Sequence, residues 1–268
     1  MTMFRYLLIA FLSAATLVTG AAKAASTTNF SDQWWIENES GWGASVLQQS
    51  DVLFIDVFVY GPDSKPTWFT AAAFFQGNAP AGHVLFTGDL YSTTGPYYGG
   101  SFNPGAVGYA KVGTLTFDAD TVNTARLSYS VNGVPVAKNV TRQTWRNENL
   151  SGSYYGGNVG EQTSCGADTG HYEEETFIQI NHAADNSITM TWTDLRNRSM
   201  NVNGTYSQSG HMGQIVGTGR RVDLGLNATV NLFEIERTIA GITGRGHIVL
   251  QSSDGSCTWD GRWGGVRR

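Results

Sequence analysis

The chain has little cysteine, little charge and only one long apolar run. It holds two cysteines in 268 residues, and charged residues make up 15% of it. Paired Cys-x-x-Cys zinc motifs are therefore excluded, as are the Gly-x-Ser-x-Gly, phosphate-loop and calcium-loop patterns, none of which occurs. Scarce charge combined with 33 glycines is typical of short strands joined by tight turns rather than of helices with charged faces.

Basic charge is also scarce. The formal net charge is −5, and without Arg5 and Lys23 of the expected leader 15 basic residues face 22 acidic ones, which gives −7. Basic residues are scattered apart from two Arg-Arg pairs at 220–221 and 267–268. No basic stripe can follow a phosphate backbone, so nucleic acid is excluded as a partner.

Residues 1–24 are predicted to be an export signal. Arg5 precedes an apolar run over 6–18, and small residues lead to an expected cleavage after Ala24. No second run of about 18 apolar residues follows, so no membrane-spanning helix is expected. The expected mature chain does not begin with cysteine, which leaves no site for a lipid anchor. We therefore expect a protein released into the periplasm or the medium of a Gram-negative bacterium.

Cys165 and Cys257 are the only cysteines. In an oxidising compartment a single bridge between them is expected, and a metal-binding pair is the less favoured alternative. The bridge would stabilise the second half of the chain.

Strand-like segments recur every 8 to 12 residues, which is typical of a barrel or a sandwich. We predict an all-β fold of two tandem antiparallel up-and-down β-barrels over 25–146 and 147–268, with β-sandwiches as the alternative. The polar stretch 146–152 marks the boundary, and Asn132-Gly133 predicts a tight hairpin turn. Expected strands lie near 42–49, 51–60, 67–75, 84–92, 109–118, 124–132, 135–145, 150–156, 172–182, 188–193, 198–208, 211–219, 228–239, 244–251 and 257–263.

The stretch "WWIENESGWGASVLQQSDVLFIDVFVYGPDSKPTWF" resembles a module of secreted or surface-attached proteobacterial proteins. That module runs Trp-Trp, Glu-Ser-Gly-Trp-Gly, a strand pair and Gly-x-Pro-Thr-Trp. The resemblance continues through "GDLYSTTGP" and "VGTLTF" to "KNVTRQTW" and covers 33–145. It implies a secreted β-domain without a settled activity, and Asp56-Val57 departs from its usual pattern. A looser likeness to avidin- and lipocalin-type barrels concerns form only.

The tryptophans of this module have two explanations. They can close the end of a barrel, because an indole buries a large area. They can also line an open mouth and stack on a flat or sugar-like ligand beside a few polar groups. The candidate ligand-binding residues are Trp35, Glu39, Trp42, Asp56, Trp68, Tyr97 and Tyr98.

The segment "DVLFIDVFVY" is apolar on both alternating faces. We expect its outer face to be covered by the second half of the chain or by another copy, which would make the protein a homo-oligomer. Asp56 lies between Phe54 and Phe58 on one of these faces, where a structural carboxylate with hydrogen-bond partners is the alternative to a ligand contact.

"HYEEETFIQINH" carries the densest group of titratable residues, which includes Glu174 and His182. In a strand, His171, Glu173 and Glu175 point the same way and could form an acid–base pair. The alternative is a solvated edge whose charges discourage aggregation. No metal site is predicted.

Three functions remain open at this point. The favoured one is a secreted, non-catalytic binding protein for a small molecule, a glycan or an extracellular protein, without a cofactor. The second is an extracellular hydrolase that uses His171 with Glu173 or Glu175. The third is a secreted inhibitor or structural protein that acts through its surface.

Overall fold

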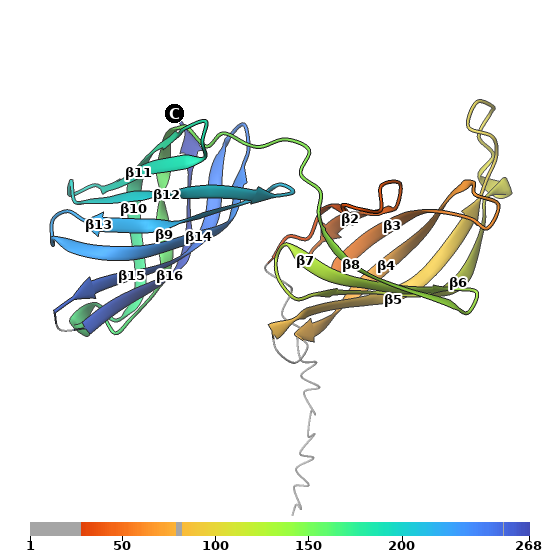
Figure 1. Ribbon diagram of the computed structural model, residues 1–268, viewed down its shortest axis with the longest axis horizontal. Helices are drawn as coiled ribbons and strands as arrows, with labels where there is room; N and C mark the ends of the chain where they lie inside the picture. Colours follow the sequence, from red (N-terminus) through yellow and green to blue (C-terminus); the bar gives the residue numbers. More distant parts are fainter. Residues whose placement is uncertain (1–27, 79–81, 254) are drawn as a thin grey trace, which may run out of the picture.

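The computed structural model describes residues 28–78, 82–253 and 255–268, so the predicted leader 1–24 lies outside the described residues. These residues form two closed antiparallel barrels of eight strands each, which lie side by side (Figure 1). The prediction of tandem barrels is confirmed, and the sandwich alternative is wrong. Within the described residues, no helix has the length and apolar character needed to cross a membrane.

The first barrel is a meander in which each strand pairs with the next and the last pairs with the first. A 3-10 turn, η2 (Pro104–Ala106), lies between its fifth and sixth strands. Its strands are β1 (Asp32–Trp35), β2 (Gly43–Gln49), β3 (Val52–Tyr60), β4 (Pro66–Asn78), β5 (Val84–Thr94), β6 (Gly108–Ala119), β7 (Thr124–Val131) and β8 (Val134–Arg142).

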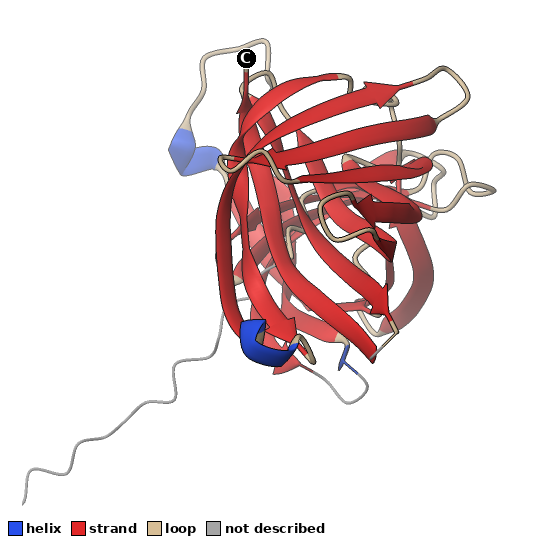
Figure 2. Ribbon diagram, turned by 90° about the vertical axis from the view of Figure 1, so that its left-hand side faces the viewer, coloured by secondary structure: helices blue, strands red, loops and turns tan. Residues whose placement is uncertain are grey.

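The second barrel repeats this order and closes between its first and last strands. Figure 2 looks onto it and shows that strands make up nearly the whole of its wall. A 3-10 turn, η3 (Gly166–Asp168), caps one end. Its strands are β9 (Gly152–Thr163), β10 (Gly170–His182), β11 (Ser187–Asp194), β12 (Ser199–Ser209), β13 (Met212–Arg221), β14 (Leu226–Arg237), β15 (Gly241–Ser252) and β16 (Gly255–Arg267).

The predicted hairpin between β7 and β8 is confirmed. Asn132 and Gly133 have φ angles of 49° and 85°, the left-handed values that a two-residue turn between twisted strands requires. The strand β1, in contrast, was not predicted, because four residues are too few to show an alternating pattern.

β3 turns one apolar face inward and one outward. Leu53, Ile55 and Val57 are buried inside the barrel, whereas Phe54 and Phe58 are 45% and 46% exposed on its outside. The second barrel therefore does not cover this outer face, and the expectation that the second half of the chain would do so is wrong. Neighbouring strands extend it into an outer aromatic face made of Leu47, Phe54, Phe58, Trp68 and Phe74.

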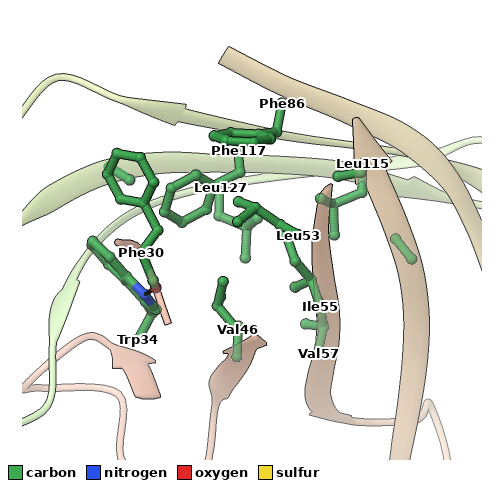
Figure 3. Packing of buried hydrophobic residues seen from close by; sticks show 14 of the residues in the cluster. Phe30, Trp34, Val46, Leu53, Ile55, Val57, Phe86, Leu115, Phe117 and Leu127 are labelled. Atoms are coloured by element: carbon green, nitrogen blue, oxygen red, sulfur yellow. Dashed lines mark hydrogen bonds between the residues drawn. The ribbon is translucent and has the colours of Figure 1, made fainter. Parts of the chain in front are cut away.

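Large apolar side chains fill the interior of the first barrel (Figure 3). Trp34 is fully buried, and its ring meets Phe117 edge to face at 5.0 Å between centroids. The Trp34 indole N–H donates to the carbonyl of Phe30 at 3.0 Å, and the Arg142 guanidinium lies 4.8 Å from the Trp34 ring centroid. The tryptophan buried in the core of this barrel is thus Trp34, which precedes the candidate Trp35.

The two barrels meet through a group of charged residues. Asp32 on β1 accepts hydrogen bonds from the backbone and the ring Nδ1 of His211, at 3.0 and 2.9 Å, and from Arg142 at 3.2 Å. His211 lies in the turn between β12 and β13, so this turn of the second barrel docks on the first strand of the first barrel. Glu236 lies 3.8 Å from the other ring nitrogen of His211.

Candidate functional site

The candidate site is a cavity inside the second barrel, at the end near the Cys165–Cys257 bridge. The inner cavity has a volume of about 70 Å³ and adjoins a wider vestibule of about 600 Å³, with which it shares five lining residues. A single water needs roughly 10 to 15 Å³ of such space, so the inner cavity has room for several waters or a small group. The inner cavity is lined by Asn158, Gln162, Tyr172, Glu174, Thr176, Trp192, Asp194, Arg198, Met200, Arg221, Ile248, Leu250 and Trp259.

Strand alternation explains which side chains reach the inner cavity. On β10, Tyr172, Glu174 and Thr176 line it, while the intervening residues face outward. The strands on either side of β10 supply Trp192 from β11 and Asn158 from β9. The inner cavity is therefore lined by inward-facing side chains of neighbouring strands.

Four buried side-chain polar atoms of residues that line the inner cavity have no hydrogen-bond partner within the part of the chain that the structure describes. They are the indole nitrogens of Trp192 and Trp259, the hydroxyl of Thr176 and the side-chain oxygen of Asn158. Thr176 is 1% exposed, and the two tryptophans are 5% and 7% exposed. A buried polar group without a partner costs about 1 to 3 kcal/mol. Buried polar groups without a partner are few in native proteins, and each of these four requires an explanation such as a water or another bound group.

Trp263 shows what a structural tryptophan looks like in this barrel. It is 3% exposed and packs edge to face against Trp192 with 5.8 Å between the ring centroids. Its indole N–H donates to the carbonyl of Arg245 at 3.1 Å. Burial alone therefore does not leave an indole N–H unpaired in this fold.

Charged residues surround the neck between the inner cavity and the vestibule, and they pair with one another. Arg198 donates to Asp194 at 2.5 Å and to Glu174 at 2.7 Å. Tyr172 donates its hydroxyl to the other oxygen of Glu174, and Arg221 donates to Asp223 at 2.7 Å. Each of these side chains at the neck therefore has a hydrogen-bond partner in another of them.

The pKa values of this network follow from its contacts. Burial opposes ionisation of the Asp194 carboxyl, but hydrogen bonds from the backbone and the guanidinium of Arg198 hold its pKa at about 2. Burial, together with the neighbouring Asp194, raises the pKa of Glu174. Burial and the bond to Glu174 raise the pKa of the Tyr172 phenol well above its ordinary value. Arg198 thus serves as the counter-ion of both carboxyl groups.

The residues of the predicted acid–base pair lie outside the inner cavity. His171 is at the vestibule, 3.3 Å from Glu161 and 3.9 Å from Glu173. Glu173 and Glu175 are exposed on the outer side of β10, and Glu175 accepts a hydrogen bond from Tyr155. No group of three or more His, Cys, Asp or Glu side chains suited to a metal ion occurs among the residues the structure describes.

The tryptophan-motif candidates do not converge on a single mouth. The Trp42 indole N–H donates to the Tyr129 hydroxyl at 3.2 Å. Lys138 makes a cation–π contact with the Trp42 ring and an ion pair with Glu39. Trp35 follows the buried Trp34 on β1 and is half-buried.

The remaining candidates form two further groups. Asp56 and Trp68 belong to the outer side of β3 and β4, where Trp68 is 52% exposed. Tyr97 and Tyr98 lie in the exposed loop after β5, with their ring centroids 4.7 Å apart. None of them lines the inner cavity.

Replacing Thr176 by valine tests the unpaired hydroxyl. Valine keeps the branched shape and removes a buried polar atom without a partner, so we expect the free energy of unfolding of the unliganded protein to rise by about 1 kcal/mol. Urea denaturation measures the change. Thr191→Val is the matched control, because the Thr191 hydroxyl faces outward and donates to Asn201 at 3.1 Å. A loss of stability in Thr176→Val that exceeds the loss in the control would contradict this account.

Comparisons with protein-family models, with curated proteins and with solved structures find no match to this chain. The functional assignment therefore depends on the geometry of the cavity.

Proposed function

We propose that this protein is an exported, non-catalytic binding protein whose second barrel encloses a small molecule. The observation that carries the proposal is the inner cavity of the second barrel, whose lining residues include four with unpaired buried polar atoms. Apolar walls from Met200, Ile248 and Leu250 with a few polar groups among them are the usual composition of a small-molecule site. The vestibule gives such a molecule a route from solvent.

Export is supported by the Cys165–Cys257 disulfide, which the structure contains. Disulfides persist in the periplasm and outside the cell, and they are rare in the reducing cytosol. The proposal therefore places the ligand among molecules that the protein meets beyond the inner membrane.

A small-molecule library tests the proposal. We expect compounds that bind to raise the melting temperature and to shift the indole ¹H–¹⁵N resonances of Trp192 and Trp259, because binding to the native state alone stabilises it by mass action. Hits that shift only resonances of the first barrel, or a library without hits, would contradict the proposal.

A variant that blocks the neck provides the matched control. Leu250 lines both the inner cavity and the vestibule and is half-buried, so Leu250→Trp places an indole in the path of the ligand. We expect it to weaken binding of any hit by at least tenfold. Val249→Trp alters the adjacent, outward-facing position on β15 and should leave binding unchanged. Equal affinities in the two variants would place the ligand elsewhere.

A further inference from the structure

The loop between β5 and β6 of the first barrel projects into solvent and carries exposed aromatic side chains. Figure 1 shows this loop, in yellow, extending beyond the ends of the barrel strands. Tyr97 and Phe102 are each 70% exposed, and Tyr98 is 92% exposed. We call these three side chains, together with the loop residues 95–107 that hold them, the aromatic tip. The aromatic tip lines neither the inner cavity nor the vestibule of the second barrel.

The aromatic tip carries no charge. Residues 90–110 contain no Asp, Glu, Lys, Arg or His. Charges return at both ends of this stretch, where Asp89 on β5 and Lys111 on β6 form an ion pair at 2.7 Å and remain about half exposed. This ion pair marks a polar boundary at the base of an otherwise uncharged loop.

Contacts within the loop order the aromatic tip. The rings of Tyr97 and Tyr98 pack with 4.7 Å between their centroids, and the backbone N–H of Gly100 donates to the carbonyl of Tyr97 at 3.2 Å. In the turn η2, the Asn103 side chain accepts from the backbone N–H of Gly105 at 3.0 Å. Backbone groups that are already hydrogen-bonded cost less to move into less polar surroundings.

The area and the shape of the aromatic tip restrict what it can bind. Its three side chains present on the order of 450 Å², whereas a stable protein interface takes about 800 Å² from each partner. Small-molecule sites are concave, but this loop projects. A lipid surface fits better, because an apolar projection can enter the boundary between headgroups and acyl chains. Tyrosine suits that boundary, since it combines an apolar ring with a polar hydroxyl.

We propose that the aromatic tip inserts into the headgroup region of a zwitterionic lipid surface and attaches the first barrel to it peripherally. Asp89 and Lys111 limit the depth of insertion, because charged groups are costly to bury in hydrocarbon. Attachment through so few side chains is weak and reversible, as it is for a single acyl chain. The inference goes beyond the proposed function and does not depend on the cavity of the second barrel.

Cosedimentation of the full mature protein with phosphatidylcholine vesicles tests the inference. The test variant is the double substitution Tyr98→Ser with Phe102→Ser. Trp145→Ser is the matched control, because Trp145 is exposed to a similar degree but lies in the segment that joins the two barrels. Since all three side chains are exposed, we expect unchanged melting temperatures, which would show that the variants fold.

We expect the double variant to bind the vesicles at least tenfold more weakly than the wild type, because interfacial binding scales with the apolar area that enters the lipid. Trp145→Ser should bind as the wild type does. Equal binding by the wild type and the double variant, or no binding of the wild type to phosphatidylcholine, would overturn the inference.

Charge provides a second test of the same contact. Because the aromatic tip is uncharged, vesicles of equal parts phosphatidylcholine and phosphatidylglycerol should bind the protein no more tightly than phosphatidylcholine alone. Salt at about 0.5 M, which screens exposed charges, should not release it. Binding that requires phosphatidylglycerol and is released by salt would assign the contact to basic residues elsewhere and would overturn the inference.

Discussion

Reduction of the Cys165–Cys257 disulfide is expected to lower the free energy of unfolding of the second barrel by about 4 to 5 kcal/mol. The bridge spans 92 residues of sequence, and a crosslink that closes a loop of about this length removes that much conformational freedom from the unfolded chain. It joins the loop between β9 and β10 to β16, next to the Thr163–Thr258 pair of the ladder that closes the barrel. Urea denaturation with and without a reductant measures the loss.

The first barrel provides the internal control, because residues 1–164 contain no cysteine. We expect the unfolding midpoint reported by the indole resonance of Trp263 to fall on reduction and the midpoint reported by Trp34 to change far less. A loss below about 1 kcal/mol at Trp263 would show that the bridge does not restrain the unfolded chain as the loop-entropy account requires. Equal losses at both tryptophans would show that the two barrels unfold as one unit.

Replacement of Asp32 by asparagine is expected to cost about 3 to 5 kcal/mol, since it leaves the buried guanidinium of Arg142 without its carboxylate partner. The Arg142 side chain has no exposed surface. Its remaining hydrogen bonds go to carbonyl oxygens, including those of Asn29 at 2.6 Å and Val122 at 2.8 Å. These oxygens can orient the guanidinium but do not neutralise it. Thermal and urea denaturation measure the loss.

Asp89→Asn is the matched control for this substitution. Asp89 also pairs with a cation, Lys111, at 2.7 Å, but both side chains are about half exposed. Exposed ion pairs contribute at most about 1 kcal/mol, so the control should lose little stability. Comparable losses in the two variants would mean that burial of Arg142 does not determine the effect.

The same Asp32→Asn substitution should change the pH dependence of stability through His211. Burial alone would lower the pKa of His211, but the hydrogen bond to Asp32 and the nearby carboxylate of Glu236 raise it to about 9. A raised pKa in the folded state stabilises the protein fully below the unfolded value of about 6.5, and this contribution is lost as pH rises toward 9. We expect the wild-type protein to lose stability in that window and Asp32→Asn to show a much weaker slope. Parallel slopes would contradict the assignment.

Local sequence patterns were sufficient to predict the class of this fold. Alternation over "SITMTWTD" predicted one buried face, and Ile188, Met190 and Trp192 are indeed buried. Barrel closure could not be predicted in the same way, because it depends on pairing between β9 and β16, which are far apart in the sequence. Glycines make this pairing close: a Cβ added to Gly156 would lie 2.0 Å from the carbonyl oxygen of Gly264. A sandwich would satisfy the same local pattern.

The candidate site was less accessible to sequence reasoning. The tryptophan motif of the first half drew attention to that half, whereas the inner cavity lies in the second. Trp192 and Trp263 look alike in sequence, since both are inward-facing residues of strands. Only the packed structure shows that Trp263 reaches the carbonyl of Arg245 while the N–H of Trp192 meets none within the described chain. Hydrogen-bond satisfaction depends on distant segments, which local patterns do not encode.

The short ladder that closes the first barrel bears on the order of folding during synthesis. β1 and β8 pair at two positions, Trp34 with Arg142 and Trp35 with Thr141, whereas β9 and β16 pair at ten. His211, which belongs to the second barrel, binds Asp32 on this same β1. The N-terminal half leaves the ribosome first, so β1 emerges before His211, whose hydrogen bond to Asp32 adds to the contacts that β2 and Arg142 make with this strand. A chain truncated after the first barrel would keep the β1–β8 ladder of two residue pairs and lose the contact with His211.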